Sequence, residues 1–374
     1  MTILLTPPMF HNQKIVSAPC AIPFHAHIVL LVLLLCAIAL PARALPPASE
    51  LEGVDTPTVD TFEMQISLGR LQASTRPIDL RGADARGAIS LPIPARLRIH
   101  EAELDLFYTN SIALLPRSQL AISLDERILA QLPLRANQPD NNARLRLPAD
   151  SLKSGYHTLG FRAAQHYTDQ CEDGGAPELL SQIDAEYSRL NLRVSRLPVP
   201  LSLGRLKDIF DSRLWLERFP LSVISASPDL LQAENYAVQG VALRLDFIPL
   251  AVDRQPLSQA LSNSLAQVPD KAQDIERVFK REPISTLEQS DILLIGTREQ
   301  LADTLGERAL ASIQGSYLGI YRLDSDPSRA VVVLSGLDQA EVEQAARLFA
   351  LTGFALPDRQ DVQIGALQLS LIHI

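Results

Sequence analysis

The sequence predicts two domains of different class, an antiparallel β-sandwich followed by an α/β domain built on a mostly parallel sheet. Up to about residue 196 the segments alternate apolar and polar side chains, as strands with one face in water do. Later segments are continuous apolar runs separated by helical patterns, which is typical of strands buried on both faces. A chain of 374 residues is long enough to form two such cores.

The N-terminal region has the features of a secretory signal. The apolar run 28–40 is followed by the small-x-small sequence Ala42-Arg43-Ala44, which a signal peptidase accepts. The run is shorter than the ~20 residues that a membrane span needs. We therefore expect a signal peptide over 1–44 and a flexible, Pro-rich leader over 45–61, with an uncleaved N-terminal anchor as the alternative.

Charge and cysteine content exclude two classes of protein. The chain carries 43 acidic and 34 basic residues, a formal net charge of -9, so it has no electrostatic footprint for nucleic acid. Cys171 is the only cysteine after residue 44, which rules out an intrachain disulfide in the exported part. A disulfide-stapled domain and a nucleic-acid-binding domain are both excluded.

The first domain is predicted over 62–196 as a set of short strands joined by turns. One face of each strand is apolar, as in the residues Leu120, Ile122, Leu124, Leu145, Leu147, Leu190, Leu192 and Val194. Near His100 the apolar positions switch from odd to even numbers, and this switch predicts a β-bulge. These features favour an antiparallel sandwich.

The second domain is predicted over 197–374, after the boundary sequence Pro198-Val-Pro200. Its buried strands are expected in the apolar runs 221–226, 291–295 and 329–334. Ser227 and Asp338 are predicted helix N-caps, because each precedes a helical apolar pattern. Strands that alternate with helices in this way are typical of a flavodoxin-like sheet.

Ligands of such sheets bind at the carboxyl ends of the strands, so the loops there are where a phosphate-binding motif would lie. Gly296-Thr297-Arg298 and Ser335-Gly336-Leu337 could each offer backbone N-H groups to an anion, although a single glycine before a helix is more often a tight turn. The sequence contains neither G-x-G-x-x-G nor a Walker motif. No cofactor is expected.

Catalytic and metal-binding patterns are weak. His100 and His157 lack the spacing of metal ligands, so no metal site is expected. Glu101 and Glu103 would share one strand face, where a sugar-cleaving pair is conceivable, but solvated charges on a strand are far more common. No catalytic residue is predicted, and the chain is expected not to be an enzyme.

Three segments together carry a family resemblance. They are Ser111 to Leu120, Leu159 to Glu172 with its sequence His166-Tyr167-Thr168-Asp169-Gln170-Cys171-Glu172, and Ile183 to Leu192. With them the chain resembles the N-terminal half of the periplasmic regulatory subunit of bacterial cellulose synthase, also called the cyclic di-GMP-binding protein family. The resemblance implies a jelly-roll, carbohydrate-binding-module-like first domain and a flavodoxin-like second domain.

The same resemblance implies a function. It implies a non-catalytic subunit in the periplasm, associated with the cell inner membrane, that supports the cellulose synthase catalytic subunit and guides the emerging β-glucan. Membrane contact would come through the partner or through an uncleaved N-terminus. Cyclic di-GMP is implied only by the family's label, because the usual basic receptor motifs are absent. The alternative is an exported glycan-active enzyme with an attached carbohydrate-binding module.

Aromatic residues are the candidates for carbohydrate contact in the first domain. They are Tyr108, Tyr156, Tyr167 and Tyr187, all at or near ends of predicted strands. An exposed ring at such a place can stack on the apolar face of a pyranose. The other interpretation of each ring is a core or corner tyrosine.

Overall fold

The structure is a computed structural model that describes residues 60–262 and 278–364. All of these residues belong to one compact unit. The predicted signal peptide over 1–44 and nearly all of the leader over 45–61 lie outside the described residues, so both stay predictions.

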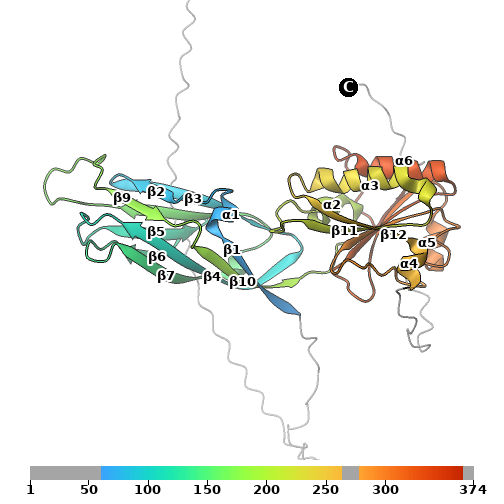
Figure 1. Cartoon of the computed structure of the whole chain (residues 1–374), viewed down its shortest axis with the longest axis horizontal. Coiled ribbons are helices and arrows are strands. Elements are labelled where there is room, and N and C mark those ends of the chain that lie inside the picture. Colours follow the sequence, from blue (N-terminus) through green and yellow to red (C-terminus); the bar gives the residue numbers. More distant parts are fainter. Residues whose placement is uncertain (1–59, 263–277, 365–374) are drawn as a thin grey trace, which may run out of the picture. The chain divides into compact units, whose positions relative to one another are not determined.

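Residues 61–196 form two antiparallel sheets (Figure 1, blue to green). The first sheet has the order β1-β10-β4-β9-β2, with β7 also paired to β4, and the second has the order β3-β8-β5-β6. The strands are β1 (Thr61–Ser67), β2 (Ile78–Arg81), β3 (Asp84–Ile93), β4 (Leu97–Asn110), β5 (Gln119–Leu124), β6 (Arg127–Pro133), β7 (Asp140–Leu147), β8 (Gly155–Ala164), β9 (Leu180–Ile183) and β10 (Arg189–Arg196). Two short helices, α1 (Leu68–Leu71) and the 3-10 turn η1 (Ala149–Ser151), complete the domain. The predicted sandwich is confirmed.

The sandwich core is formed by the inward faces of both sheets. Leu104 and Leu106 of β4 and Leu120 and Ile122 of β5 are fully buried, as the alternation predicts. Along β4 and β10 the pairing slips by one residue: Arg193 faces Glu101, but Val194 faces Ile99. The extra residue is His100, so the predicted bulge is confirmed.

Residues 199–364 form the second domain, whose single sheet has the order β12-β11-β13-β15-β14-β16. Its strands are β11 (Phe219–Ser225), β12 (Leu250–Pro256), β13 (Asp291–Ile295), β14 (Tyr317–Arg322), β15 (Ala330–Ser335) and β16 (Asp361–Gln363). The first four strands of this order are parallel, β14 is antiparallel to β15, and β16 is antiparallel to β14 and so runs in the direction of the first four. The mostly parallel sheet is confirmed, and the flavodoxin-like assignment stays a prediction because of the reversed strand β14.

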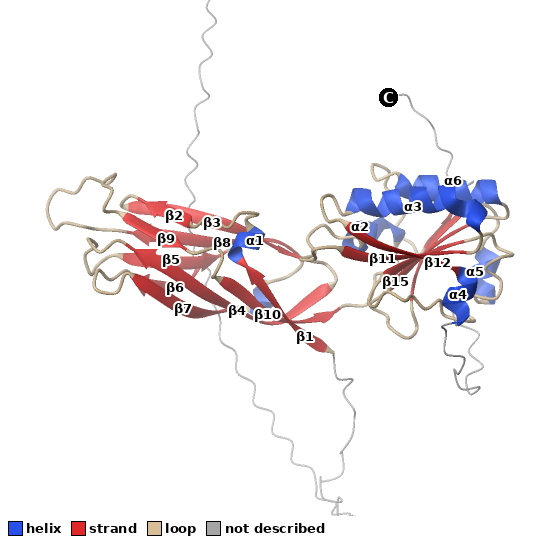
Figure 2. Cartoon of the chain, in the orientation of Figure 1, coloured by secondary structure: helices blue, strands red, loops and turns tan. Residues whose placement is uncertain are grey.

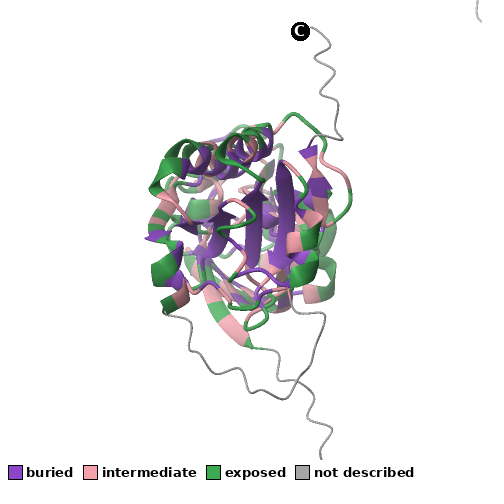
Figure 3. Ribbon diagram, turned by 90° about the vertical axis from the view of Figure 1, so that its right-hand side faces the viewer, coloured by how far each residue is buried: buried purple, intermediate pink, exposed green. Residues whose placement is uncertain are grey.

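Helices cover both faces of this sheet, as Figure 2 shows in blue. They are η2 (Leu203–Arg205), α2 (Leu206–Ile209), η3 (Pro228–Leu230), α3 (Leu231–Arg244), α4 (Leu257–Ser262), α5 (Glu307–Ser312) and α6 (Gln339–Ala350). Side chains of α2, α3 and α6 share one apolar core, and those of α4 and α5 share another on the opposite face. Figure 3 shows the buried strands between the two helical layers.

The predicted helix caps form as expected. The Ser227 hydroxyl accepts a hydrogen bond from the Asp229 N-H at 3.3 Å, at the start of η3 and α3. The Asp338 carboxylate accepts one from the Glu341 N-H at 2.9 Å, at the start of α6. Glu341 accepts in return from the N-H of Leu337, so the reciprocal bond reaches the residue before the N-cap.

A buried ion pair connects the β3–β4 turn to the start of β13. The Arg96 guanidinium donates to both carboxylate oxygens of Asp291, at 2.5 and 3.0 Å, and also to the Ser328 carbonyl. The two side chains are only 13% and 4% exposed. Asp291 also accepts from the N-H of Ala330 at 2.8 Å, so its charge is fully partnered.

Candidate functional site

Tyr108 does not lie where a sugar could reach it. After the bulge, even-numbered residues of β4 point into the core, and Tyr108 is only 5% exposed. Burial raises the pKa of its phenol, which therefore stays neutral. The prediction of an exposed ring at this position is wrong, because the strand's alternation extends to its end.

Tyr156 and Tyr167 lie at opposite ends of β8, because Tyr156 is the second residue of the strand and Tyr167 lies three residues after its end. Eight residue steps of about 3.4 Å each place the end of the strand roughly 27 Å from Tyr156. Tyr156 is 70% exposed. Tyr167 is half-buried against the sandwich core, and its hydroxyl accepts from the Asp173 N-H at 3.3 Å. The two rings therefore cannot form one site.

Tyr187 is 62% exposed and has an aromatic neighbour, Phe107, which is 40% exposed on the outer face of β4. Their backbones adjoin: the Phe107 N-H donates to the Ser188 hydroxyl at 2.9 Å, and the Asp184 N-H donates to the Phe107 carbonyl at 2.9 Å. We call Phe107 and Tyr187 the ring pair. Phe107 was not among the predicted contacts, although the odd-outward parity of β4 points to it.

The turn that carries Tyr187 is fixed by one carboxylate. Oδ1 of Asp184 accepts from the N-H groups of Glu186 at 3.0 Å and Tyr187 at 2.9 Å. This is the local bonding that lets aspartate organise a tight turn. A ring held by such a turn loses less conformational freedom when it binds a ligand.

Carboxylates on the outer face of β4 are each paired with arginine. Glu101 pairs with Arg193, while Glu103 and Asp105 both lie close to Arg144, at 3.2 and 2.7 Å. The hydrogen bond from Arg144 lowers the pKa of Asp105, against the opposing effect of burial. Acids neutralised in this way stabilise a flat sheet face, and they do not resemble a poised acid and base.

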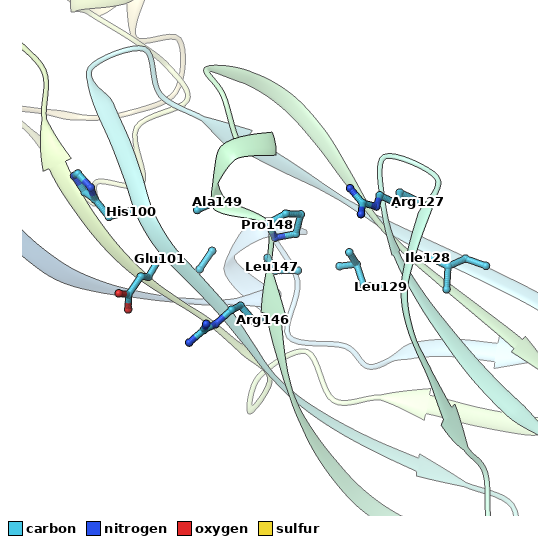
Figure 4. A pocket seen from close by; sticks show the side chains of 10 residues that line it. His100, Glu101, Arg127, Ile128, Leu129, Arg146, Leu147, Pro148 and Ala149 are labelled. Atoms are coloured by element: carbon cyan, nitrogen blue, oxygen red, sulfur yellow. The ribbon is translucent and has the colours of Figure 1, made fainter.

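A shallow hollow of about 480 Å³ lies between the edges of the two sheets. Its lining comes from β4, β6 and the end of β7: His100, Glu101, Ala102, Arg127, Ile128, Leu129, Arg146, Leu147, Pro148 and Ala149. Figure 4 shows Arg127 on the β6 side and Glu101 on the β4 side, with Leu147 and Pro148 between them. None of these side chains is a phenyl, phenol or indole ring, so the hollow offers no stacking platform for a sugar.

The loop after β8, where the sequence resemblance is strong, is folded around His166. Its Nδ1 lies 2.9 Å from Oε2 of Glu172, whose other oxygen accepts from the Tyr167 N-H at 2.7 Å. The hydrogen bond with His166 is the larger cause of a lowered pKa of Glu172, and the bond from the Tyr167 N-H lowers this pKa further. Cys171 is exposed in this loop with a free thiol. The motif thus shapes a loop, and its bonds are structural.

Backbone N-H groups in the loops after β13 and β15 already have acceptors within the chain. Gly296, Thr297, Arg298 and Leu337 donate to the Leu334 carbonyl, the Gln300 side chain, the Gly336 carbonyl and Glu341, respectively, at 2.6 to 3.2 Å. An anion would have to displace these bonds. The geometry therefore does not support the phosphate interpretation of these loops.

Two negative findings concern the described residues. Within 60–262 and 278–364, no three His, Cys, Asp or Glu side chains gather as they would around a metal ion. Among the helices of the same residues, none combines the length and the apolar content that a bilayer crossing demands.

Comparison with known proteins identifies the first domain. Residues 61–196 match the family model described as "Cellulose synthase BcsB, first CBM domain". The first domain is BcsB-like. The boundaries of the match coincide with the sandwich from the start of β1 to the end of β10.

Curated relatives extend the BcsB-like resemblance. The chain is 26% identical over 163 residues to the "Cyclic di-GMP-binding protein" of Escherichia coli K12, which covers 40% of this chain and 21% of that protein. It is 26% identical over 205 residues to the protein of that name from Salmonella typhimurium, covering 51% and 25%. The matched region therefore spans about a quarter of each relative's length or less.

Solved structures give weaker likenesses to parts of this chain. A family 35 carbohydrate-binding module from an environmental isolate is 14% identical with a TM-score of 0.22, covering 34% of this chain and 81% of that one. The sugar-binding EclA C-terminal domain is 14% identical with a TM-score of 0.20, covering 40% and 88%.

Proposed function

We propose that this chain is a non-catalytic periplasmic subunit of the bacterial cellulose synthase complex, associated with the cell inner membrane through its partner. It supports the catalytic subunit and guides the emerging β-glucan. The observation that carries this proposal is the match of the whole sandwich to the first carbohydrate-binding-module domain of BcsB. The α/β domain, which we propose is flavodoxin-like, would be the second domain of this subunit.

We propose that the ring pair is where the sandwich touches the glucan. Phe107 and Tyr187 are exposed rings on neighbouring segments, because Phe107 is hydrogen-bonded to Asp184 and Ser188 of the turn that carries Tyr187, whereas Tyr156 and Tyr167 lie at opposite ends of β8. One ring on a strand and one on a fixed turn beside it offer an apolar surface of the kind that stacks on pyranose faces. The arginine-paired carboxylates beside them offer no support for a glycan-cleaving role.

Association with the synthase is tested by capture from membranes. The tagged full chain is expressed with the catalytic subunit from the same genome, the membranes are solubilised in detergent, and the tag is captured. The catalytic subunit should co-purify with the chain. Its absence from the captured fraction, while the chain itself is folded and exported, would show that the chain is not a synthase subunit.

Glucan contact by the sandwich is tested by affinity electrophoresis in gels that contain hydroxyethyl cellulose. The double variant Phe107→Ala/Tyr187→Ala should lose most of the retardation that glucan binding by the sandwich causes. Tyr156→Ala removes a ring that is 70% exposed at the start of β8 and is the control. Equal retardation of the ring-pair variant and the control would contradict this placement.

The printed name of the relatives raises cyclic di-GMP as a ligand for this chain. We propose that the chain needs no cofactor and that its α/β loops do not hold this dinucleotide, because their N-H groups are already bonded. Equilibrium dialysis of the full chain against labelled cyclic di-GMP tests this. Saturable binding that weakens with Thr297→Pro, which removes one of these N-H groups, would contradict it.

A further inference from the structure

The long helix α3 has buried charged residues and an uncharged exposed face, which reverses the usual arrangement of a surface helix. Its two charged residues, Glu234 and Arg244, are only 7% and 8% exposed. Its exposed and half-buried residues are all uncharged: Leu231, Gln232, Asn235, Tyr236, Val238, Gln239, Ala242 and Leu243. Surface helices normally place charge toward water, so this face is poorly explained by solvation alone.

The N-terminal half of this face borders a shallow hollow of about 560 Å³. It is lined by Asp229, Leu231, Gln232, Asn235, Tyr236 and Gln239. The last four residues follow the spacing i, i+3, i+4, i+7, so they form one stripe along the helix. At 1.5 Å per residue the stripe is about 10 Å long, which suits a short stretch of a chain-like ligand.

The ring in this stripe is held in place. The Arg347 guanidinium lies 5.2 Å from the centre of the Tyr236 ring, and Glu343 fixes that arginine with an ion pair of 2.5 Å. Gln232 Nε2 lies 3.4 Å from the Tyr236 hydroxyl. A positioned ring loses little freedom on binding.

The amides beside the ring keep donors and acceptors for a ligand. Asn235 Oδ1 accepts from Arg254 at 3.1 Å, which fixes the amide and leaves its NH2 group facing other partners. Gln339 Nε2 donates to the Asp229 carbonyl at 2.8 Å and so ties α6 to this end of α3. Gln239 makes no side-chain hydrogen bond among the described residues.

We propose that this stripe on α3 is a second glycan-binding site, which takes a neutral β-glucan chain. Primary amides match the paired donor and acceptor character of sugar hydroxyls, and the half-buried Tyr236 ring offers the part of its surface that neither Arg347 nor the core covers. A protein partner would need about 800 Å² on each side, far more than these six side chains present. The choice of a glucan as the ligand rests on the proposed function. The inference that a binding site exists rests on the side chains of α3.

The experiment is affinity electrophoresis of the full chain in gels with hydroxyethyl cellulose, started from the ring-pair variant so that the sandwich contributes little. Adding Tyr236→Ala should weaken the remaining association about 5- to 10-fold, and Gln239→Ala should weaken it less. Gln314→Ala, an exposed glutamine on the other side of the domain, is the control and should change nothing.

Three results would overturn the proposal. One is equal retardation with and without Tyr236→Ala, and another is no retardation of the ring-pair variant at all. A third is a shift to a dimer by light scattering that Tyr236→Ala abolishes, because the face would then bind a second copy. None of these results changes whether the catalytic subunit co-purifies with the chain. Failure of the glycan site on α3 can therefore be told apart from failure of the proposed function.

Discussion

The imidazole of His157 is held between two oxygen atoms. Its Nδ1 lies 2.6 Å from Oδ2 of Asp125, and its Nε2 lies 2.8 Å from the Lys153 carbonyl oxygen. Both neighbours only accept hydrogen bonds, so both ring nitrogens must donate, which requires the imidazolium form. Burial by itself would lower the pKa of His157, but the bonds to Asp125 and Lys153 outweigh it and the pKa is raised.

The His157–Asp125 pair makes stability depend on pH. Because the pKa of His157 is raised in the folded protein, the protonated imidazole stabilises the fold. This stabilisation is complete below the pKa of His157 in the unfolded chain, about 6.5, and is lost as pH rises through its pKa in the folded protein. The hydrogen bond from His157, and then that from the Thr158 N-H, lowers the pKa of Asp125. The stability that ionised Asp125 contributes is present above the pKa of Asp125 in the unfolded chain, about 3.9. It is lost as pH falls through the pKa of Asp125 in the folded protein.

We therefore expect His157→Gln to cost about 1 kcal/mol near pH 5 and much less above pH 8. The urea midpoint of wild type and variant, measured from pH 4 to 9, checks this. A difference between the two proteins that stays constant across that range would show that His157 is not charged in the native state.

Glu126→Gly should stabilise the sandwich. Asp125 and Glu126 form the two-residue connection between β5 and β6, with φ angles of +47° and +69°. Two positive φ angles are the mark of a type I′ hairpin turn, where glycine is favoured at the second position. We expect a gain of about 0.5 to 1 kcal/mol in the free energy of unfolding by urea titration. Glu126→Ala keeps the Cβ atom, so the same gain from that control would contradict the backbone explanation.

Gly319→Ala should destabilise the α/β domain. A Cβ atom there would lie 2.8 Å from the Tyr317 hydroxyl and 2.9 Å from Cε2 of Tyr321. These two tyrosines flank the glycine on β14, and their hydroxyls are 2.5 Å apart. We expect a cost of about 2 kcal/mol by thermal or urea unfolding, because the buried rings have little room to shift. Gly353→Ala, which meets no atom within 4 Å, should be neutral, and equal costs at both positions would refute the crowding argument.

Removal of Arg96 should be among the most damaging single changes. Arg96→Ala leaves the Asp291 carboxylate, 4% exposed, without its counter-charge, and such changes cost about 3 to 5 kcal/mol. Arg98→Ala removes an exposed arginine two residues away and is the control. Adding Asp291→Asn to Arg96→Ala should restore part of the loss. A cost below about 1 kcal/mol for Arg96→Ala would mean that the pair is not formed in solution.

Patterns confined to a few neighbouring residues were predictable from the sequence. Alternation predicts the strands of the sandwich, the change of parity predicts the bulge at His100, and Ser227 and Asp338 begin their helices where capping chemistry places them. These features depend on local backbone geometry, so the sequence carries them directly. The same parity already placed Tyr108 inward and Phe107 outward.

Only the tertiary structure decided which distant residues meet. The neighbourhood of Phe107 and Tyr187 depends on the pairing of β4, β9 and β10. The reversed direction of β14 depends on its pairing with β15 and β16 in the sheet. Spacing along α3 does not reveal that Arg244 is buried. Its guanidinium is accommodated because α6 brings the ring and carbonyl of Phe349 against it, at 4.6 and 2.8 Å. Contacts between elements far apart in the chain are set by packing of the whole domain, which no local pattern encodes.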